Sequence, residues 1–407
     1  MMLKKSLYNV AVRREDGWIV YNTLYNSLIR LSDSEYTAYH SVEKTTAKLV
    51  ECLCENGFWV DAEIDEYKRY EFLRRKALPY FSETYQFTVA LTTKCNAKCV
   101  YCYQENAKQY DMTVRCAERI AELICCSKKL KSAVFTWFGG EPLLKPELID
   151  CITDRLRYEK IAYSGGIVTN GSLLTKQMIE EHFLKWNINY VQITLDGTDQ
   201  EYLKRKRYSG SAGNIFWKVL DNIALLLHYG VYVYIRLNID KNNEDDILNV
   251  AEILNERFQD ESRLMIYPAF LTGIDNCIET EEHRVYIAEA IQKHISGIGK
   301  DAVKELLESP PKLNACILDR PHAYTIDADG SILYCERDIG KQQKSLNVFD
   351  IESFDGKDTG GSVLSYSRCK TCCYYPKCLG GCTSCASSGY DACFIERYLI
   401  EAYLKYC

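Results

Sequence analysis

Apolar and polar positions divide the chain into three stretches with different periodicity. In the longest stretch, short apolar runs alternate with segments of helical spacing. The apolar runs cover residues 85–93, 133–140, 165–170, 190–197, 231–239 and 263–270. Strands that alternate with helices form parallel sheets through right-handed crossovers. Six such units rather than eight predict an α/β fold with an open, partial β/α barrel over residues 85–270, with a doubly wound sheet as the alternative. In both architectures functional residues gather at the carboxyl ends of the strands.

Residues 1–84 have a different pattern, in which short strands precede helices. Asp16-Gly17 separates two alternating runs, which is typical of a β-hairpin, and residues 27–31 predict a third strand. Ser32 and Glu35 have the spacing of a capping box, so a short helix should begin there. We therefore expect a small α+β domain over residues 1–84.

Two segments with different sequence patterns follow the predicted barrel. Residues 271–311 are mostly helical in spacing and end at Pro310-Pro311, so we interpret them as a helical linker. Residues 312–407 are rich in cysteine and glycine and contain few long periodic segments before a closing helix. This pattern is typical of a domain held together by metal rather than by a large apolar core.

Charge and cysteine content narrow the function classes. The formal net charge of −6 argues against a protein that coats nucleic acid. No apolar run reaches the ~20 residues of a membrane helix, and the N-terminus lacks the apolar region of a signal peptide. We therefore expect a cytoplasmic protein with neither nucleic acid nor membrane as a partner. Twenty cysteines in 407 residues are the outlier, and a long chain of this kind favours metal or iron–sulfur sites over a secreted disulfide scaffold.

The first cysteine cluster follows the first predicted barrel strand. Cys95, Cys99 and Cys102 have the spacing C-x3-C-x2-C. Three thiolates can hold a [4Fe–4S] cube and leave one of its four irons open to another ligand. Structural zinc sites require four protein ligands, and no fourth Cys or His lies nearby. The position on a βα loop favours a catalytic site.

This motif, placed after a first barrel strand, resembles the radical S-adenosylmethionine (SAM) superfamily. A second motif agrees, because Gly139-Gly140-Glu141-Pro142 follows the second strand, as the GGEP-type motif does in that family. The resemblance implies that the backbone and the acid of this motif bind the methionine amino group of SAM. Glycines allow a close backbone approach, and a carboxylate pairs with an ammonium.

The resemblance carries over to further SAM contacts. It places Tyr101 near the adenine, Asn170 at the end of the third strand, and Asp196 at the end of the fourth strand near the ribose. Arg205 corresponds to an arginine that faces the SAM carboxylate, with Lys206 or Arg207 as alternative equivalents. Arg236, which lies with Asn238 in the fifth strand, is a further candidate because a charge in an apolar strand needs a partner.

The C-terminal cysteines are similar to the SPASM pattern, which carries two auxiliary [4Fe–4S] clusters. The resemblance assigns Cys369, Cys372, Cys378 and Cys393 to the distal cluster. It assigns Cys316, Cys335 and Cys382 to the cluster nearer the barrel. With three ligands, the nearer cluster either has an open iron or is reached by a remote residue such as Cys277. Zinc ribbons are the alternative reading of these cysteines.

The resemblance implies an oxidoreductase with SAM and three [4Fe–4S] clusters as cofactors. The reduced first cluster would cleave SAM to a 5′-deoxyadenosyl radical that abstracts hydrogen from the substrate. The electron would come from a donor such as flavodoxin or ferredoxin. Because such clusters are oxygen-labile, we expect an anaerobic setting.

SPASM enzymes mostly act on peptides and proteins. Residues 1–84 resemble the winged-helix-like unit that binds the leader of a precursor peptide, so we expect a maturase of a ribosomally synthesised peptide that forms Cys thioether (S–C) crosslinks. One alternative is a formylglycine-generating anaerobic sulfatase maturase. The long segment before Cys95, and Glu336 where that group carries an Asp, argue against it. An alternative of another class is a non-catalytic, metal-stabilised peptide-binding module.

Overall fold

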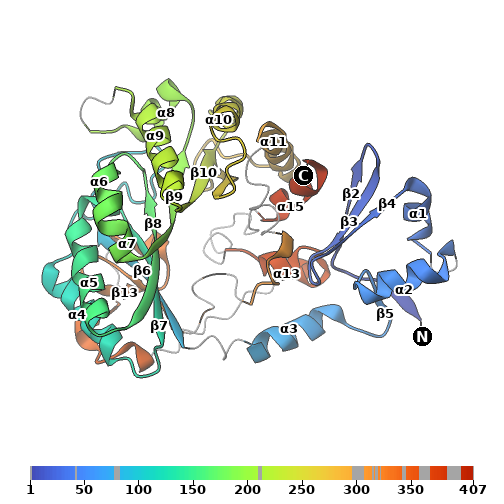
Figure 1. The fold of residues 1–407 in the computed structure, drawn as a ribbon, viewed down its shortest axis with the longest axis horizontal. Coiled ribbons are helices and arrows are strands. Elements are labelled where there is room, and N and C mark those ends of the chain that lie inside the picture. The colour runs from blue at the N-terminus through green and yellow to red at the C-terminus, as the bar shows by residue number, and fades with distance from the viewer. Residues whose placement is uncertain are drawn as a thin grey trace.

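The computed structural model describes most of the chain (Figure 1). The described residues are 2–41, 44–77, 83–209, 213–295, 307–313, 316, 320, 322–341, 345–356, 367–382 and 396–406.

A nine-stranded sheet of order β11-β10-β9-β8-β7-β6-β12-β13-β14 dominates the molecule. Its first six strands are all parallel, which confirms the predicted β/α alternation. These strands are β6 (Thr84–Thr92), β7 (Ser132–Gly139), β8 (Ala162–Thr169), β9 (Ile188–Leu195), β10 (Tyr232–Ile239) and β11 (Leu264–Phe270). They form the open, partial barrel that the sequence predicts.

Helices cover the outer face of this curved sheet (Figure 1). They are α4 (Val114–Cys126), α5 (Pro146–Tyr158), α6 (Lys176–Met178), α7 (Leu184–Trp186), α8 (Asp199–Lys206), α9 (Ile215–His228) and α10 (Glu244–Arg257). The core lies between the two layers, where Phe135 and Trp137 of β7 are fully buried together with Ile120 and Ile124 of α4. Burial of such side chains is the main stabilising contribution to this part of the molecule.

Three short strands extend the barrel sheet beyond β6. Strand β12 (Ala323–Ile326) runs parallel to β6, and β13 (Ser331–Leu333) and β14 (Leu346–Asn347) follow in antiparallel order. A turn joins β12 to β13, in which the Gly330 N–H donates to the carbonyl of Asp327 at 2.9 Å. The cysteine-rich region is therefore anchored to the barrel by backbone pairing, which its sparse apolar pattern did not predict.

The N-terminal unit is built on a three-stranded antiparallel sheet of order β2-β3-β4. Strands β2 (Asn9–Arg14) and β3 (Gly17–Asn22) form the predicted hairpin at Asp16-Gly17, and β4 (Ser27–Leu31) is the predicted third strand. Helix α1 (Asp33–Ala38) begins at the capping box of Ser32 and Glu35, as expected. Its further elements are α2 (Ala47–Glu55), α3 (Glu66–Ala77) and an additional pair, β1 (Leu3–Lys5) with β5 (Trp59–Asp61).

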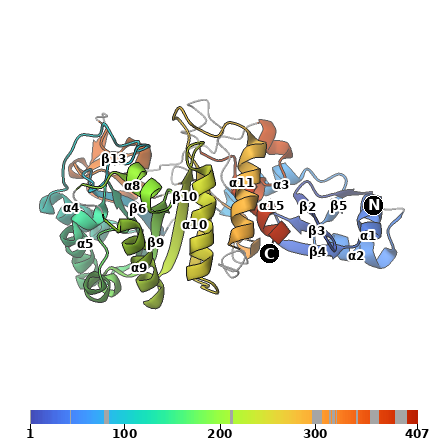
Figure 2. The same cartoon turned by 90° about the horizontal axis from the view of Figure 1, so that it is seen from above.

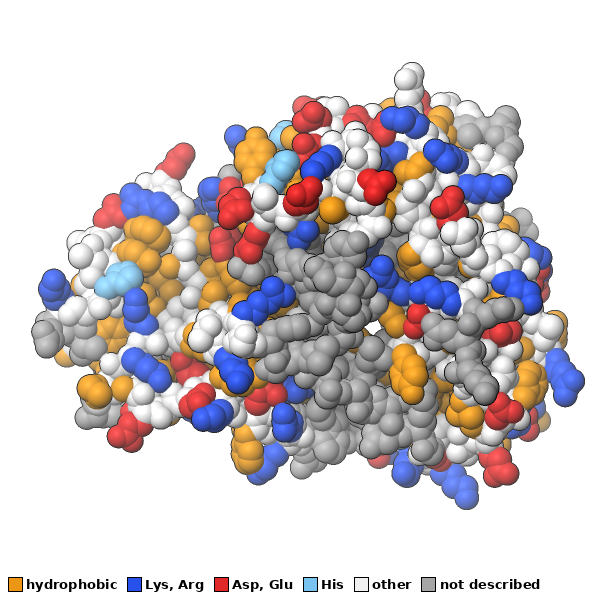
Figure 3. All heavy atoms as spheres, turned by 180° about the vertical axis from the view of Figure 1, so that it is seen from behind, with side chains coloured by type: hydrophobic (Ala, Val, Ile, Leu, Met, Phe, Trp, Pro, Cys, Tyr) orange, Lys and Arg blue, Asp and Glu red, His pale blue; other side chains and the backbone are white. Residues whose placement is uncertain are grey.

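The N-terminal unit lies at the far end of the molecule from the barrel (Figures 1 and 2). Helices α11 (Glu281–His294), α13 (Tyr375–Cys378) and α15 (Glu396–Tyr406) lie between them. On the face shown in Figure 3, basic and acidic side chains are mixed rather than separated into fields of one sign. None of the helices in the described part of the chain has the length and apolarity that crossing a bilayer requires.

Candidate active site

The three clustered cysteines lie in the loop that leaves the carboxyl end of β6. Cys95, Cys99 and Cys102 form no disulfide. Burial raises the pKa of the Cys95 thiol to about 12, and negative charge on Glu141, Cys99 and Cys102 adds to this effect, so the three thiols are close to one another. No three His, Cys, Asp or Glu side chains converge on a single metal ion within the described ranges. Three thiols grouped in one loop are a donor set that fits a [4Fe–4S] cube, which spreads its ligands over different irons.

The last residues of α8 and the residues that follow it hold this loop in place. We call residues 205–209 the α8 strap. The Lys98 N–H donates to the carbonyl of Lys206 at 2.9 Å, and the Val100 N–H donates to the carbonyl of Arg205 at 2.9 Å. The Ser209 N–H donates in turn to the carbonyl of Asn96 at 2.9 Å. The cysteine loop is therefore fixed by backbone pairing with a segment about one hundred residues later in the chain.

The glycines of the Gly139-Gly140-Glu141-Pro142 motif allow β7 to end directly against the cysteine loop. Gly139 has φ +128°, and a Cβ there would collide with the carbonyl of Thr92. A Cβ on Gly140 would collide with the carbonyl of Lys94. The Gly140 N–H donates to Thr92 at 2.8 Å and the Glu141 N–H to Lys94 at 3.0 Å. Pro142 is buried and begins a 3-10 helix.

The carboxylate of Glu141 lies between the ends of β7 and β8. It is completely buried and accepts hydrogen bonds from Thr169 Oγ1 at 2.7 Å, the Leu143 N–H at 3.1 Å and the Asn170 N–H at 2.8 Å. Both oxygens are therefore engaged in joining the end of β7 to the end of β8. Oε1 accepts two of these hydrogen bonds and Oε2 accepts one, so the pairing of this acid with the SAM ammonium stays a prediction.

Asn170 lies beside the first cysteine, at the end of β8. Its Nδ2 is 3.9 Å from Cys95 Sγ and donates to Asn96 Oδ1 at 2.8 Å. Its Oδ1 accepts from the Ser172 hydroxyl at 2.6 Å. The residue that the sequence placed at the third strand's end thus contacts the cysteine loop directly.

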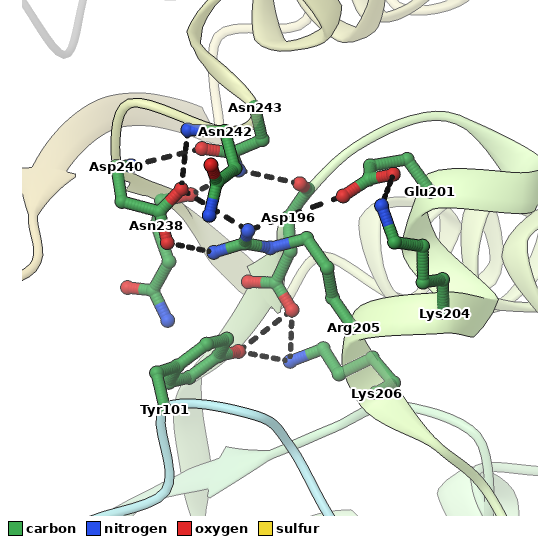
Figure 4. A network of polar contacts seen from close by, with 10 residues as sticks. All are labelled: Tyr101, Asp196, Glu201, Lys204, Arg205, Lys206, Asn238, Asp240, Asn242 and Asn243. Carbon is green, nitrogen blue, oxygen red and sulfur yellow. Dashed lines mark hydrogen bonds and ion pairs between the residues drawn. The ribbon is translucent and has the colours of Figure 1, made fainter. Parts of the chain in front are cut away.

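Asp196, which follows β9, has one engaged and one unpartnered oxygen (Figure 4). Its Oδ2 accepts from Tyr101 Oη at 2.6 Å and lies 3.2 Å from Lys206 Nζ. Its Oδ1 is buried without a hydrogen-bond partner in the described structure. A buried carboxylate oxygen without a donor is costly, so this atom fits a ligand hydroxyl such as that of a ribose.

Arg205 is directed away from Asp196 toward the end of β10. Its two terminal nitrogens bind the Asp240 carboxylate at 3.1 and 2.7 Å, and Figure 4 shows this bidentate pair above Tyr101. This guanidinium is therefore already paired with a protein carboxylate, whereas the expectation was that it faces the SAM carboxylate. Of the alternative equivalents, Lys206 is buried beside Tyr101 and Asp196, and Arg207 is exposed.

Sequence reasoning missed two residues of this network. Asp240 binds Arg205, and Asn243 Nδ2 donates to the backbone carbonyl of Asp196 at 2.6 Å. Asp240 directly follows β10, as Asp196 follows β9. A polar residue at the end of a parallel strand was the signal that could have identified it.

Arg236 lies on β10 and contacts Asn238, which also belongs to the network of Figure 4. Its Nε donates to Asn238 Oδ1 at 2.9 Å. Burial raises the pKa of Glu336, and the positive charge of Arg236 opposes that rise, so the two side chains are near each other. Arg236 is therefore close to Glu336, the residue that follows Cys335.

The structure brings together some of the predicted auxiliary ligands. Burial raises the pKa of Cys335, and negative charge on Glu336, Asp338 and Cys382 adds to it, so Cys382 is within electrostatic reach of Cys335. Cys369 and Cys378 are both buried, and Cys369 packs against Tyr8 and Tyr70 of the N-terminal unit. Cys372 packs beside them. Cys316 lies near Arg320, and Cys277 near Lys241. Cys393 lies outside the described residues.

Comparison with known proteins identifies the barrel. The model of the radical SAM superfamily matches residues 89–254, from β6 into α10. The chain is 29% identical over 173 residues to a probable GTP 3′,8-cyclase of Archaeoglobus fulgidus, covering 41% of this chain and 54% of that protein. It is 30% identical over 170 residues to the serine-type anaerobic sulfatase-maturating enzyme of Bacteroides thetaiotaomicron, covering 38% and 39%. The chain spans about half of the length of these relatives or less.

Solved structures share the fold over more of the chain. The structure of native anSMEcpe with bound AdoMet and Cp18Cys peptide aligns with a TM-score of 0.59 at 18% identity, covering 79% of this chain and 94% of that one. Streptococcus suis SuiB bound to S-adenosylmethionine aligns with a TM-score of 0.51 at 17% identity, covering 98% and 100%. At these identities the alignments establish a common fold.

Proposed function

Because the chain belongs to the radical SAM superfamily, whose members bind SAM and a [4Fe–4S] cluster, we propose that it is a peptide maturase. It would cleave SAM reductively and modify a ribosomally synthesised precursor peptide, forming a thioether between a Cys sulfur and a carbon. The observation that carries this proposal is the N-terminal three-stranded unit docked on residues 369–382, which we call the auxiliary cysteine segment: Tyr21 packs against Tyr374, and Tyr8 against Cys369.

In this proposal Cys95, Cys99 and Cys102 hold the first cluster, whose fourth iron binds SAM. Bound at this site, the reduced cluster and SAM supply a 5′-deoxyadenosyl radical that takes a hydrogen atom from the substrate. The unpartnered oxygen of Asp196 accepts a ribose hydroxyl, while Tyr101 holds the other oxygen in place. Asn170 and the backbone of residues 139–141 frame the SAM site from β8 and β7.

We further propose two auxiliary [4Fe–4S] clusters. Cys369, Cys372, Cys378 and Cys393 would bind the distal one, and the proximity of Cys335 and Cys382 supports a nearer one shared with Cys316. Thioether formation removes two electrons and two protons from the substrate. One electron and one proton leave together as the hydrogen atom, the thiol proton leaves to solvent, and the second electron needs an acceptor. Auxiliary clusters are suited to receive that electron, and a donor such as flavodoxin or ferredoxin supplies the first cluster.

The N-terminal unit offers an edge for the peptide's leader. Strand β4 is the last strand of its sheet in the described part of the chain. Helix α15 packs on one face of this sheet, since Val10 of β2 and Tyr21 of β3 share a cluster with Ile400 and Leu404, and β4 contributes no residue to that cluster. An extended leader could therefore add to β4 as a further strand, with affinity from backbone hydrogen bonds. A peptide-bound structure of the same fold and a protein-maturing relative support a peptide substrate.

The test is to incubate the reconstituted, reduced enzyme with SAM and the precursor peptide encoded beside its gene. A thioether predicts a product lighter by two hydrogen atoms and one cysteine that iodoacetamide no longer alkylates. A matched peptide without its leader should react much more slowly. An unchanged peptide mass, together with SAM cleavage, would contradict the peptide assignment.

A formylglycine-generating activity is the second candidate, favoured by the 30% identity to a sulfatase-maturating enzyme. A peptide carrying a sulfatase modification sequence distinguishes the two. Conversion of its Cys or Ser to an aldehyde, detected with a hydrazide probe, would establish this activity, and the thioether proposal predicts no aldehyde.

A further inference from the structure

Lys206 is a buried ammonium group beside the cysteine loop. Its side chain is 3% exposed, and its Nζ lies 3.0 Å from Tyr101 Oη and 3.2 Å from Asp196 Oδ2. The rings of Tyr101 and Tyr202 each lie 5.7 Å from Nζ. A buried cation is held this way only when it is paired and hydrogen-bonded, which this one is.

The backbone of Lys206 fixes this charge relative to the cysteines. Lys206 belongs to the α8 strap, and its carbonyl accepts from the N–H of Lys98, the residue before Cys99. Tyr101, which binds the ammonium, lies between Cys99 and Cys102 in the same loop. The side chain and the main chain of Lys206 are therefore both tied to the cysteine loop.

The ammonium is also within electrostatic reach of two of the cysteines. Burial raises the pKa of both Cys99 and Cys102, and the positive charge of Lys206 opposes the rise at each, while Asp196 acts in the opposite sense at Cys99. This agrees with the contacts that tie Lys206 to Lys98 and Tyr101.

We propose that Lys206 is a positioning residue that raises the reduction potential of the cluster held by Cys95, Cys99 and Cys102. Reduction adds one negative charge to the cluster, and a fixed cation in a low-dielectric surrounding stabilises the reduced state. Because Lys206 is buried, salt screens this interaction only weakly. This inference rests on the proposed function, since it requires the first cluster to form.

The test is a redox titration of the reconstituted enzyme without SAM, followed by electron paramagnetic resonance. A variant lacking Cys95, Cys99 and Cys102 provides the signal of the auxiliary clusters for subtraction. In Lys206→Met the ratio of reduced to oxidised first cluster, at a fixed potential, should fall about tenfold, which is 59 mV for a one-electron couple. An unshifted potential in Lys206→Met would overturn the inference.

Two controls separate charge from structure. Lys204→Met removes a lysine two residues earlier on α8 whose side chain is 73% exposed, and it should leave the potential unchanged. Tyr101→Phe removes the hydroxyl that binds both Lys206 and Asp196 but removes no charge, so its potential should stay near that of the unmodified enzyme. Equal shifts in Tyr101→Phe and Lys206→Met would overturn the charge argument.

A charge cycle covers the case in which Lys206→Met fails to fold because it leaves Asp196 buried without its cation. Asp196→Asn should raise the potential, and the double variant, which removes both charges, should return it toward the original value. If the reduction potential of the double variant differs from that of the unmodified enzyme by as much as the larger of the two single-variant shifts, the inference is overturned.

If the unmodified enzyme forms no cluster that depends on the three cysteines, the proposed function fails as well. If it cleaves SAM but the cycle shows no shift, only this inference fails.

Discussion

At the scale of single residues, buried carboxylates determine how the strand ends meet. Glu141 is completely buried, yet three donors from two strand ends converge on it. Burial raises its pKa, and the hydrogen bonds from Asn170, Thr169 and Leu143 oppose that rise. The acid therefore stabilises the architecture of the site.

Glu141→Gln tests this structural role. The substitution replaces one acceptor oxygen by an amide donor that faces other donors. Hydrogen bonds to charged groups contribute about 1.5–3 kcal/mol, so the free energy of unfolding should fall by about that amount. Urea unfolding followed by circular dichroism measures the change. Glu147→Gln, at an exposed acid in the first turn of α5, should change it by less than about 0.5 kcal/mol. An unchanged midpoint in Glu141→Gln would contradict the role.

The location of a site residue could be predicted from the sequence where it depends only on the residue's place at the end of a predicted strand. Asn170 and Asp196 end parallel strands, whose carboxyl ends meet at one edge of the sheet, and both lie at the cysteine loop. The roles of Arg205, Lys206 and Arg207 could not be separated, because consecutive residues at a helix end point in different directions. Only the place where α8 meets the barrel decides that Lys206 faces Asp196 and Arg205 faces Asp240.

At the scale of elements, the α8 strap connects the polar network of Figure 4 to the cysteine loop. Arg205 binds Asp240 at the end of β10, while its own carbonyl accepts from Val100 in the loop. The backbone hydrogen bonds therefore fix the position of the cysteine loop relative to α8. Such long-range pairing has no signature in the local pattern, and neither do β12, β13 and β14, which are too short to show a period.

Arg205→Met should loosen the cysteine loop. The substitution leaves Asp240, which is 4% exposed, without its cation, and removing one partner of a buried pair costs about 3–5 kcal/mol. Amide hydrogen exchange at Lys98 and Val100, measured by mass spectrometry, should accelerate at least about tenfold, since 1.4 kcal/mol corresponds to that factor. Lys204→Met is the matched control. If the amide exchange rates of Lys98 and Val100 are unchanged in Arg205→Met, the Arg205–Asp240 pair does not stabilise the cysteine loop.

At the scale of the whole molecule, the N-terminal unit is packed against the auxiliary cysteine segment rather than tethered to it. Tyr8 and Tyr70 share an apolar cluster with Cys369, Tyr375 and Leu379. Thr23 Oγ1 donates to the carbonyl of Cys373 at 2.5 Å. A leader bound to this unit would therefore act on the segment proposed to hold the distal cluster.

Arg74 is the polar centre of this interface. It is 4% exposed, donates to the carbonyl of Leu313 at 2.9 Å and pairs with Glu71, which also accepts from Tyr375 Oη at 2.8 Å. Arg74→Ala removes the buried partner of Glu71, leaves it only the exposed Arg75 at 3.7 Å as a cation, and breaks the bond to Leu313. The single thermal transition that we expect for the unmodified enzyme should therefore split into two in differential scanning calorimetry. Arg75→Ala, at an arginine 76% exposed on the same helix, should keep one transition. One transition in both variants would contradict this coupling.

The most direct test of the central claim measures SAM cleavage at the first cysteine loop. The protein is reconstituted anaerobically with iron and sulfide, reduced with dithionite and supplied with SAM, and 5′-deoxyadenosine is quantified by liquid chromatography and mass spectrometry. The account predicts that the unmodified enzyme forms this product and that Cys99→Ala, with its auxiliary cysteines intact, forms none. No product from an enzyme that contains the cluster, or equal product from Cys99→Ala, would contradict it.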